Sequence, residues 1–349
     1  MSPKVIGTLL TGAALLALLP LLQLPSFYET LLYLIFHWIV LAVSWNILSG
    51  YSGYFSFGHG AFYGIGVYTT AVLSGHFDWP FLATLPFAAL LAAIFGVALG
   101  AVVFRLNRLR GELFALLTLA ITFVVSMVIL NTPIDGGPGI YLSNVQVPQV
   151  YGSPASSFYL LALLLALCTL LVAYAIYSGK LGLGLFAIHD DEDVAQVQGV
   201  QTFQYKLIAL GISCALAGLA GGIQALFVSY VTVAEIFNMV VPLYVMLMSV
   251  LGGVRHWAGP AVGAVFITVL LFSFTSGDMA VAGRALVGLS LIMVILFMPM
   301  GIVGQWLARQ RRLGRVPVLP KAAAPLPIEP STEPNPELLK ALQIGRAHV

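Results

Sequence analysis

The chain has 349 residues, of which 60% are hydrophobic and 8% charged, with a mean hydropathy of +1.00 and a formal net charge of +2. A soluble domain carries roughly 25% charged residues, so this composition excludes an ordinary soluble protein. It indicates an all-α, polytopic integral membrane protein. A lipid-facing β-barrel would need short alternating segments, whereas the apolar runs here are continuous.

Apolar segments long enough to cross a bilayer as helices recur along the whole chain. The first follows Lys4 and lacks a signal-peptidase cleavage site, so we interpret it as a retained helix. We expect about ten transmembrane helices (8–10), with glycine-broken segments, because apolar stretches near 20 residues recur along the chain. The expected spans are roughly 5–24, 28–49, 56–75, 81–104, 112–131, 158–177, 206–230, 238–254, 258–275 and 284–303.

The basic residues follow one face of this topology. With ten spans, 14 of the 15 lysines and arginines fall on the side of the termini, and Arg284 is the exception. The positive-inside rule makes that side cytoplasmic. The pattern therefore predicts a multi-pass protein whose two termini are both cytoplasmic.

The composition divides the chain into two parts. Residues 1–306 form the expected transmembrane domain, with a cytoplasmic loop at about 179–205. Residues 307–349 turn basic and then rich in proline, which predicts a disordered cytoplasmic tail. The last six residues, 344–349, read IGRAHV and are similar to a translated sequencing-library adapter, so we interpret them as an artefact.

Residues 48–70 hold six glycines and no Lys, Arg, Asp or Glu. Gly60 and Gly64 form a GxxxG pair, which in most membrane helices serves close helix packing. Three glycines before this pair are expected to break the helix: Gly50, Gly53 and Gly58. Ser49, Ser52 and Ser56 have the spacing of roughly one helical face.

Unwound backbone at membrane depth is tolerated only inside protein or beside a wet cavity, and its free N–H and C=O groups can bind a solute. We therefore expect the glycine stretch to form a path for a small apolar or zwitterionic solute. The candidate path residues are Ser52, Gly53, Ser56, Gly58, His59, Gly60 and Gly64.

Two histidines and a second glycine-rich segment are further candidates for the solute path. An ionisable group inside a span is a functional candidate, but hydrogen bonding of neutral His59 within the bundle explains it equally well. For His37, a packed neutral imidazole is the favoured interpretation. The glycines at 249–264 could form a paired break in the other half of the chain.

The loop at about 179–205 contains four consecutive acids before a helix-compatible stretch, Val194–Gln198, which Gly199 closes. Acids suit a helix N-terminus and glycine suits the residue after a helix, so we expect a cytoplasmic helix of about two turns. It could be a solvated surface helix or a docking element for a partner. The candidate docking residues are Asp190, Asp191, Glu192, Asp193, Ala195 and Gly199.

Catalytic motifs are missing from the sequence. It has no G-x-x-x-x-G-K-[ST] loop for ATP, no H-E-x-x-H, no G-x-S-x-G and no C-x-x-C. Cys168 and Cys214 both lie in apolar runs without metal-ligand spacing. We expect no catalytic residue, metal site or cofactor, and a transport role rather than an enzyme.

Five segments together resemble a known family. SGYSGYFSFGHGAFYGIGVYTTAVL, NRLRGELFALLTLAI, LFAIHDDEDVAQVQGV, LGGVRHWAGPAVGA and GRALVGLSLIMVILFMPMGIVG occur in this order over about residues 30–305. They resemble the permease subunits of branched-chain amino acid ABC importers, including their urea and amide relatives, and most closely the longer of the two permease types. The sequence departs from the family where Leu183, Phe186 and His189 stand at positions that commonly carry arginine.

The resemblance implies a permease subunit in a bacterial inner (plasma) membrane that forms the translocation path for branched-chain amino acids or related solutes. Its implied partners are a second permease subunit, two ATP-binding cassette subunits, an extracytoplasmic solute-binding protein and membrane lipid, without nucleic acid. ATP hydrolysis would belong to the partner subunits. Alternatives are a urea or short-chain amide importer, an ion-coupled secondary transporter or channel, and an intramembrane enzyme or assembly scaffold.

Overall fold

The structure is a computed structural model that describes residues 3–22, 25–105, 111–134, 137–147, 149–150, 153–275, 285, 288–289 and 301–312. The chain divides into a unit of residues 1–306 and a second unit of residues 307–349. The predicted tail and its last six residues lie outside the described residues, apart from the few that end the last helix.

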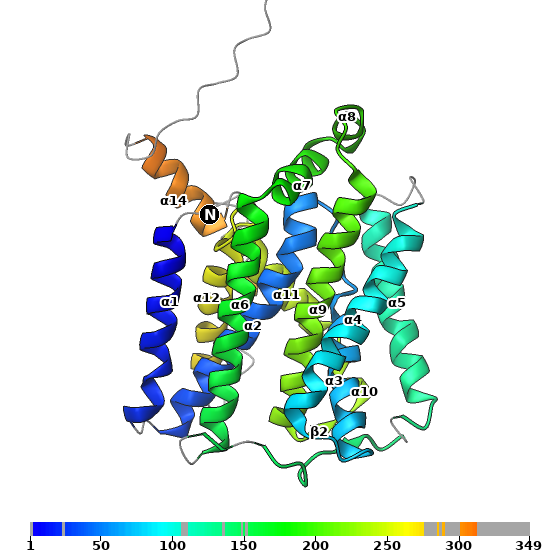
Figure 1. Cartoon of the computed structure of the whole chain (residues 1–349), viewed down its shortest axis with the longest axis vertical. Coiled ribbons are helices and arrows are strands. Elements are labelled where there is room, and N and C mark those ends of the chain that lie inside the picture. Colours follow the sequence, from blue (N-terminus) through cyan, green and yellow to red (C-terminus); the bar gives the residue numbers. More distant parts are fainter. Residues whose placement is uncertain are drawn as a thin grey trace, which may run out of the picture. The chain divides into compact units, whose positions relative to one another are not determined.

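Helices make up nearly all of the described structure, as the all-α prediction requires. The longer ones lie side by side in a bundle (Figure 1). The elements are α1 (Pro3–Ala17), η1 (Leu19–Leu22), α2 (Ser26–Ser52), α3 (His59–Gly75), α4 (Phe81–Val103), α5 (Glu112–Leu130), β1 (Ile140–Tyr141), α6 (Pro154–Ser178), α7 (Lys180–Asp190), α8 (Glu192–Val197), α9 (Thr202–Val228), β2 (Tyr230–Val231), α10 (Val233–Ile236), α11 (Val240–Gly252), α12 (Gly259–Thr275) and α14 (Gly301–Arg312).

The described residues do not confirm ten membrane spans. Seven segments are long and apolar enough to cross a bilayer: Pro3–Leu21, Ser26–Ser52, Phe81–Val103, Glu112–Leu130, Pro154–Ser178, Thr202–Val228 and Val233–Gly252. The expected span at 56–75 is helical only over the 17 residues of α3, because the chain before His59 is not helical. Gly259–Ser273 is also a shorter apolar helix, and most of the expected span at 284–303 lies outside the described residues.

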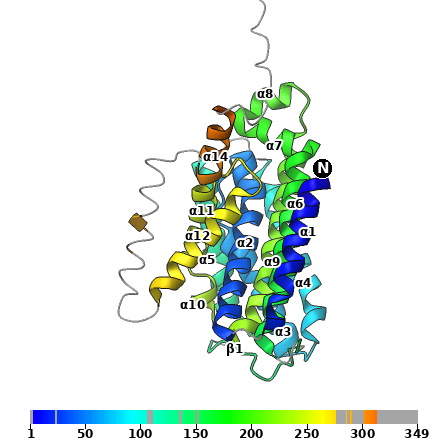
Figure 2. The same cartoon turned by 90° about the vertical axis from the view of Figure 1, so that its left-hand side faces the viewer.

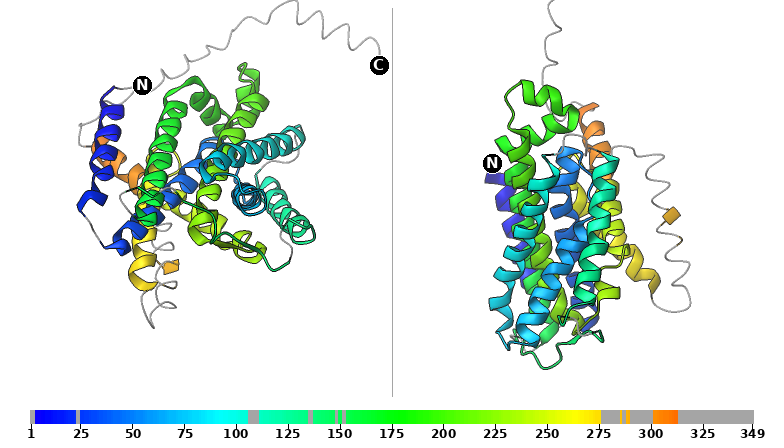
Figure 3. Two further views of the ribbon diagram at one scale, coloured as in Figure 1. Left: turned by 60° about the horizontal axis from the view of Figure 1, so that its bottom comes forward. Right: turned by 90° about the vertical axis from the view of Figure 1, so that its right-hand side faces the viewer.

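Helix α2 lies inside the bundle, and α1 lies at its edge (Figure 3). In the most apolar window of α2, 78% of residues are buried, against 6% for α1. α2 packs against α6, α9, α11 and α12, so apolar side chains all around it find protein partners. The exposed apolar residues of α1 suit contact with lipid.

Glycines let α3 approach α9 closely. A Cβ added to Gly66 would lie 2.2 Å from the carbonyl oxygen of Gly218, and one added to Gly221 would lie 2.2 Å from that of Tyr63. The GxxxG pair does not make this contact. Gly60 has its nearest neighbour, Pro242, at 3.5 Å, and Gly64 faces the ring of Phe237. The close approach of α3 to α9 therefore lies at Tyr63 and Gly66, not at the predicted pair itself.

The two ends of the bundle differ. α7 and α8 lie at one end, called here the α7–α8 end, and the strands lie at the other, called the opposite end (Figures 1 and 2). There β1 pairs antiparallel with β2, with Ile140 opposite Val231. This pairing ties the link between α5 and α6 to the end of α9.

Candidate functional site

The helix break in the glycine stretch begins at Gly53. α2 ends at Ser52, Gly53 has φ 75°, and the chain stays non-helical until α3 begins at His59. A Cβ at Gly53 would lie 2.5 Å from Nδ1 of His189, a residue of α7. Both the left-handed backbone and the closeness of α7 therefore require glycine at this position.

Side chains of α2 and α5 satisfy the backbone of this break. The indole N–H of Trp45 donates to the Ser56 carbonyl at 2.7 Å, and the Ser56 N–H donates to the Ser49 hydroxyl at 3.2 Å. The Phe57 N–H donates to the Thr118 hydroxyl at 3.1 Å. Unwound backbone thus exists here because protein groups replace the missing helical hydrogen bonds.

Two local expectations about this stretch are wrong. Gly50 does not break the helix, because it lies within α2, where a Cβ would collide with the side chain of Asn46. Ser49, Ser52 and Ser56 do not share one helical face, because Ser56 follows the end of α2. The hydroxyl of Ser52 donates back to the Leu48 carbonyl at 2.7 Å, and that of Ser56 accepts from the Gly58 N–H at 3.2 Å.

His59 begins α3 and is 2% exposed. Its Nε2 lies 3.0 Å from the Ser44 hydroxyl oxygen, and that hydroxyl donates to the Leu41 carbonyl at 3.0 Å. If the Ser44 hydroxyl donates to Leu41, Nε2–H of His59 is the donor of the other hydrogen bond. His59 is therefore hydrogen-bonded within the bundle, one of the two alternatives that the sequence left open.

A second break, residues 253–258, joins α11 to α12, as the glycines there predict. A Cβ at Gly252 would lie 1.8 Å from the Gly259 carbonyl oxygen, so the two helices meet backbone to backbone. The amide of Asn46 in α2 donates to the Val254 carbonyl at 3.0 Å. The second break therefore packs directly on the helix that leads into the first.

Both breaks also contact α7. His189 packs against Gly53, and Asp190 forms an ion pair with Arg255 of the second break at 2.9 Å. This ion pair is exposed and therefore weak. Burial, with a smaller contribution from Arg255, lowers the pKa of His189 below its ordinary value of 6.5, although Asp190 acts in the opposite direction. The imidazole facing Gly53 is consequently neutral at pH 7.

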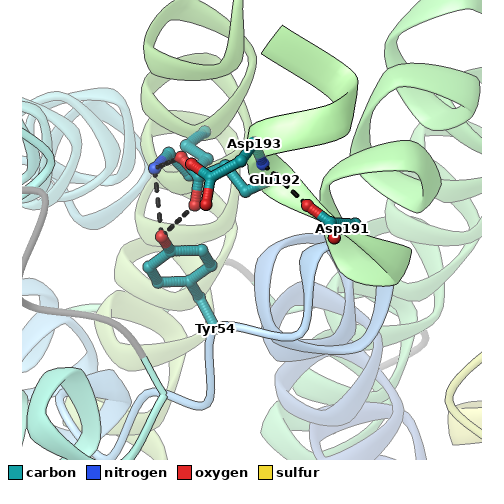
Figure 4. Close-up of polar contacts among 5 residues, drawn as sticks. Tyr54, Asp191, Glu192 and Asp193 are labelled. Atoms are coloured by element: carbon teal, nitrogen blue, oxygen red, sulfur yellow. Dashed lines mark hydrogen bonds and ion pairs between the residues drawn. The ribbon is translucent and has the colours of Figure 1, made fainter. Parts of the chain in front are cut away.

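The acidic cluster has a different role at each position. Asp191 caps α8, because its carboxylate accepts hydrogen bonds from the N–H groups of Asp193 and Val194 at 2.9 and 3.0 Å (Figure 4). The predicted helix is present, with Gly199 at φ 88° after its end. The loop is more ordered than predicted, because α7 precedes α8 and together they occupy much of it.

Glu192 points inward. Its carboxylate lies 2.5 Å from Nζ of Lys206 in α9 and accepts a hydrogen bond from the hydroxyl of Tyr54 in the first break (Figure 4). The side chains of Lys206 and Glu192 are 4% and 10% exposed. The Lys206 ammonium also lies over the rings of Tyr54 and Phe104, 4.5 and 5.0 Å from their centroids. This cluster of Tyr54, Glu192 and Lys206 joins α8, α9 and the first break.

α8 turns apolar side chains outward. Val194 is 51% exposed and Val197 is 90% exposed, whereas Ala195 is buried. Val194 and Val197 are three residues apart and therefore neighbours on one helical face. Exposed apolar residues at the tip of a water-facing helix are typical of a contact surface for another protein.

Sequence reasoning missed Tyr54 and Lys206, and did not foresee that His189 packs against Gly53. A lysine near the start of an apolar helix, 14 residues after Glu192, is the one signal that could have suggested the ion pair. Tyr54 is 152 residues from Lys206, so no local pattern could indicate their contact. Within the described ranges, no group of three or more His, Cys, Asp or Glu could hold a metal ion.

Comparisons with known proteins agree with this architecture. A family model described as branched-chain amino acid transport system / permease component matches residues 27–300. The high-affinity branched-chain amino acid transport system permease protein LivM of Escherichia coli K12 is 31% identical over 296 residues, which cover 76% of this chain and 67% of that protein. LivM of Salmonella typhimurium LT2 has the same identity and coverage.

A more distant relative is the probable branched-chain amino acid transport permease protein LivH of Methanocaldococcus jannaschii. It is 28% identical over 165 residues, 45% of this chain and 50% of that protein. No solved structure gives a significant match. The family model covers most of the helical bundle, and both LivM proteins match over most of the chain. The chain therefore belongs to the family of permease components of branched-chain amino acid transport systems.

Proposed function

We propose that the chain is one of two permease subunits in an ATP-driven importer that carries branched-chain amino acids into the bacterial cytoplasm. An extracytoplasmic binding protein delivers the solute, and two ATP-binding cassette subunits bind at the α7–α8 end. The relatives' names support the substrate class. Lys206 and Arg255 lie at the α7–α8 end, where each pairs with an acid of α7 or α8. These basic residues support the assignment of this end to the cytoplasmic side of an inner membrane.

The observation that carries this proposal is that α7 and α8 contact both backbone breaks. His189 packs against Gly53, Asp190 pairs with Arg255, and Glu192 binds Tyr54. A displacement of these two helices must therefore move the non-helical backbone at residues 53–58 and 253–258. Short breaks between rigid helices are where the backbone can absorb such a displacement.

The predicted site residues have two roles in this mechanism. Residues of the first break and the start of α3 form the wall that moves when the ATPases close: Ser52, Gly53, Ser56, Gly58, His59, Gly60 and Gly64. The coupling residues act mainly by shaping and anchoring α8, through the cap of Asp191, the ion pair of Glu192 and the turn at Gly199. The direct contact with the ATPase falls to the exposed face of Val194 and Val197.

A charge on this face tests the docking surface. Val197→Asp should prevent the ATPase subunits from co-purifying with the chain, and should abolish leucine uptake, because the buried side of α8 is untouched while its apolar contact is lost. The matched control is Val150→Asp, which changes an exposed valine outside the helices. Normal co-purification and uptake by Val197→Asp would show that α8 is only a solvated surface helix.

A further inference from the structure

A small cavity lined by both apolar and polar side chains lies within the bundle, away from α7 and α8. Its volume is about 180 Å³, and residues of α2, α3, α9, α10 and α11 line it. His37 lies 15 residues before the end of α2, which places it about 22 Å from the α7–α8 end at a rise of about 1.5 Å per residue. α10 lies near the opposite end (Figure 1). The cavity is therefore in the half of the bundle that would face the binding protein.

Two buried polar side chains of this cavity contact other aromatic rings but form no hydrogen bond with another described residue. His37 is 6% exposed and Tyr63 is 4% exposed, and their rings lie 5.8 Å apart. In the described part of the chain, neither the imidazole of His37 nor the hydroxyl of Tyr63 makes a hydrogen bond. A buried polar group without a partner is costly. These two groups are therefore arranged for something that enters the cavity.

The amide of Gln224 is a third polar group. The hydroxyl of Tyr33 donates to its Oε1 at 2.7 Å. This contact holds the side chain in place and leaves its NH2 group as a donor. His37, Tyr63 and Gln224 thus offer N–H and O–H donors from three different helices, an arrangement that suits the two oxygens of a carboxylate.

The cavity also contains one carboxylate, Glu235. It is an exposed residue of α10 at the start of the candidate membrane span Val233–Gly252 and, among the described residues, forms no ion pair. Because Glu235 lines the same cavity as His37 and Tyr63, its carboxylate is available to a cation that enters there. The remaining wall is apolar and includes Leu34 and Ile236.

We propose that this cavity binds the zwitterion of an α-amino acid during import. The ammonium group pairs with Glu235, the carboxylate accepts from His37, Tyr63 and Gln224, and an aliphatic side chain packs against Leu34 and Ile236. This inference rests on the proposed function and narrows it. Urea and simple amides have neither an ammonium nor a carboxylate group, so they would leave both halves of the site without partners.

The first test is transport by the complete importer in proteoliposomes, with L-leucine as the probe. Glu235→Gln should lower leucine uptake about tenfold or more, because a charge-assisted contact is lost. ATP hydrolysis stimulated by the leucine-loaded binding protein should persist, since α7 and α8 are unchanged. Glu112→Gln, an exposed residue in the first turn of α5, is the matched control and should transport normally.

The outcomes separate the two proposals. Normal uptake by Glu235→Gln beside an active wild type would overturn the cavity inference and leave the importer function standing. Wild-type complex that neither takes up leucine nor hydrolyses ATP in response to it would overturn the proposed function, and the cavity inference with it.

The second test measures occupancy directly in the complex without binding protein. Val241→Cys places a thiol at the cavity wall, in a Cys168→Ala background because Cys168 is exposed. L-Leucine should slow maleimide labelling of this thiol. Leucinamide, which lacks the carboxylate, and 4-methylpentanoate, which lacks the ammonium group, should not. Tyr63→Phe should weaken the protection by leucine. Equal protection by all three compounds, or by none, contradicts a zwitterion site.

Discussion

At Gly53, a hydrogen atom is the largest side chain that fits between the backbone and His189. Gly53→Ala should destabilise the fold, because a left-handed alanine costs about 1–2 kcal/mol and its Cβ must also displace the imidazole. We expect a lower thermal midpoint of the purified protein and reduced uptake. Gly60→Ala is the matched control: its Cβ has 3.5 Å to the nearest atom, so its midpoint should stay close to wild type. Equal midpoints for the two variants would contradict the packing described for Gly53.

His189 should make stability depend on pH. Its pKa is lowered by burial, so between the ordinary value of 6.5 and the lower folded value the unfolded chain binds more protons. Stability should therefore fall as the pH drops below about 6.5, and the charged neighbours Asp190 and Arg255 modify the extent of this loss. Thermal midpoints at about pH 7.5 and about pH 5.5 measure the effect. His189→Gln should show a smaller difference between the two; an unchanged difference would exclude His189 as its source.

The cluster of Tyr54, Glu192 and Lys206 joins the first break to α8 and α9. Glu192→Gln or Lys206→Met removes one charge of the buried ion pair, and each should destabilise the fold by about 3–5 kcal/mol. The double variant removes both charges, and its loss of stability should be smaller than the sum of the losses in the two single variants. Unfolding of the wild type, the two single variants and the double variant in detergent measures the energy by which the two residues are coupled. Strictly additive losses would mean that the ion pair does not connect α8 to α9.

Hydropathy predicted most long helices because apolar length is a local property of the chain. The break at Gly53 was also predictable, since glycine allows the positive φ found there. Gly50 was misjudged because whether a glycine breaks a helix or makes room for a neighbour depends on Asn46 and the surrounding packing. Glu192 was placed on a docking surface because its inward contacts come from Tyr54 and Lys206, which only the fold brings near.

At the scale of the whole molecule, two helix–break–helix segments turn at the same end and meet on α2. The contacts of Asn46 with Val254 and of Ser249 with the Ala42 carbonyl join them. The glycines at 249–264 indicated the second break, but its contact with α2 spans more than 200 residues and had no local signal. The cavity was missed because its lining comes from five separate helices and because the predicted span began at residue 238, after Glu235.

The central claim is that separate ATPase subunits drive leucine transport through this permease. Transport by the purified chain, alone and with its partners, tests it. Proteoliposomes that contain the second permease, the ATPase subunits and the binding protein should accumulate leucine when ATP is supplied on the α7–α8 side. Vesicles with this chain alone should show none, with or without an ion gradient. Accumulation of leucine against its concentration difference by the isolated chain would contradict the account.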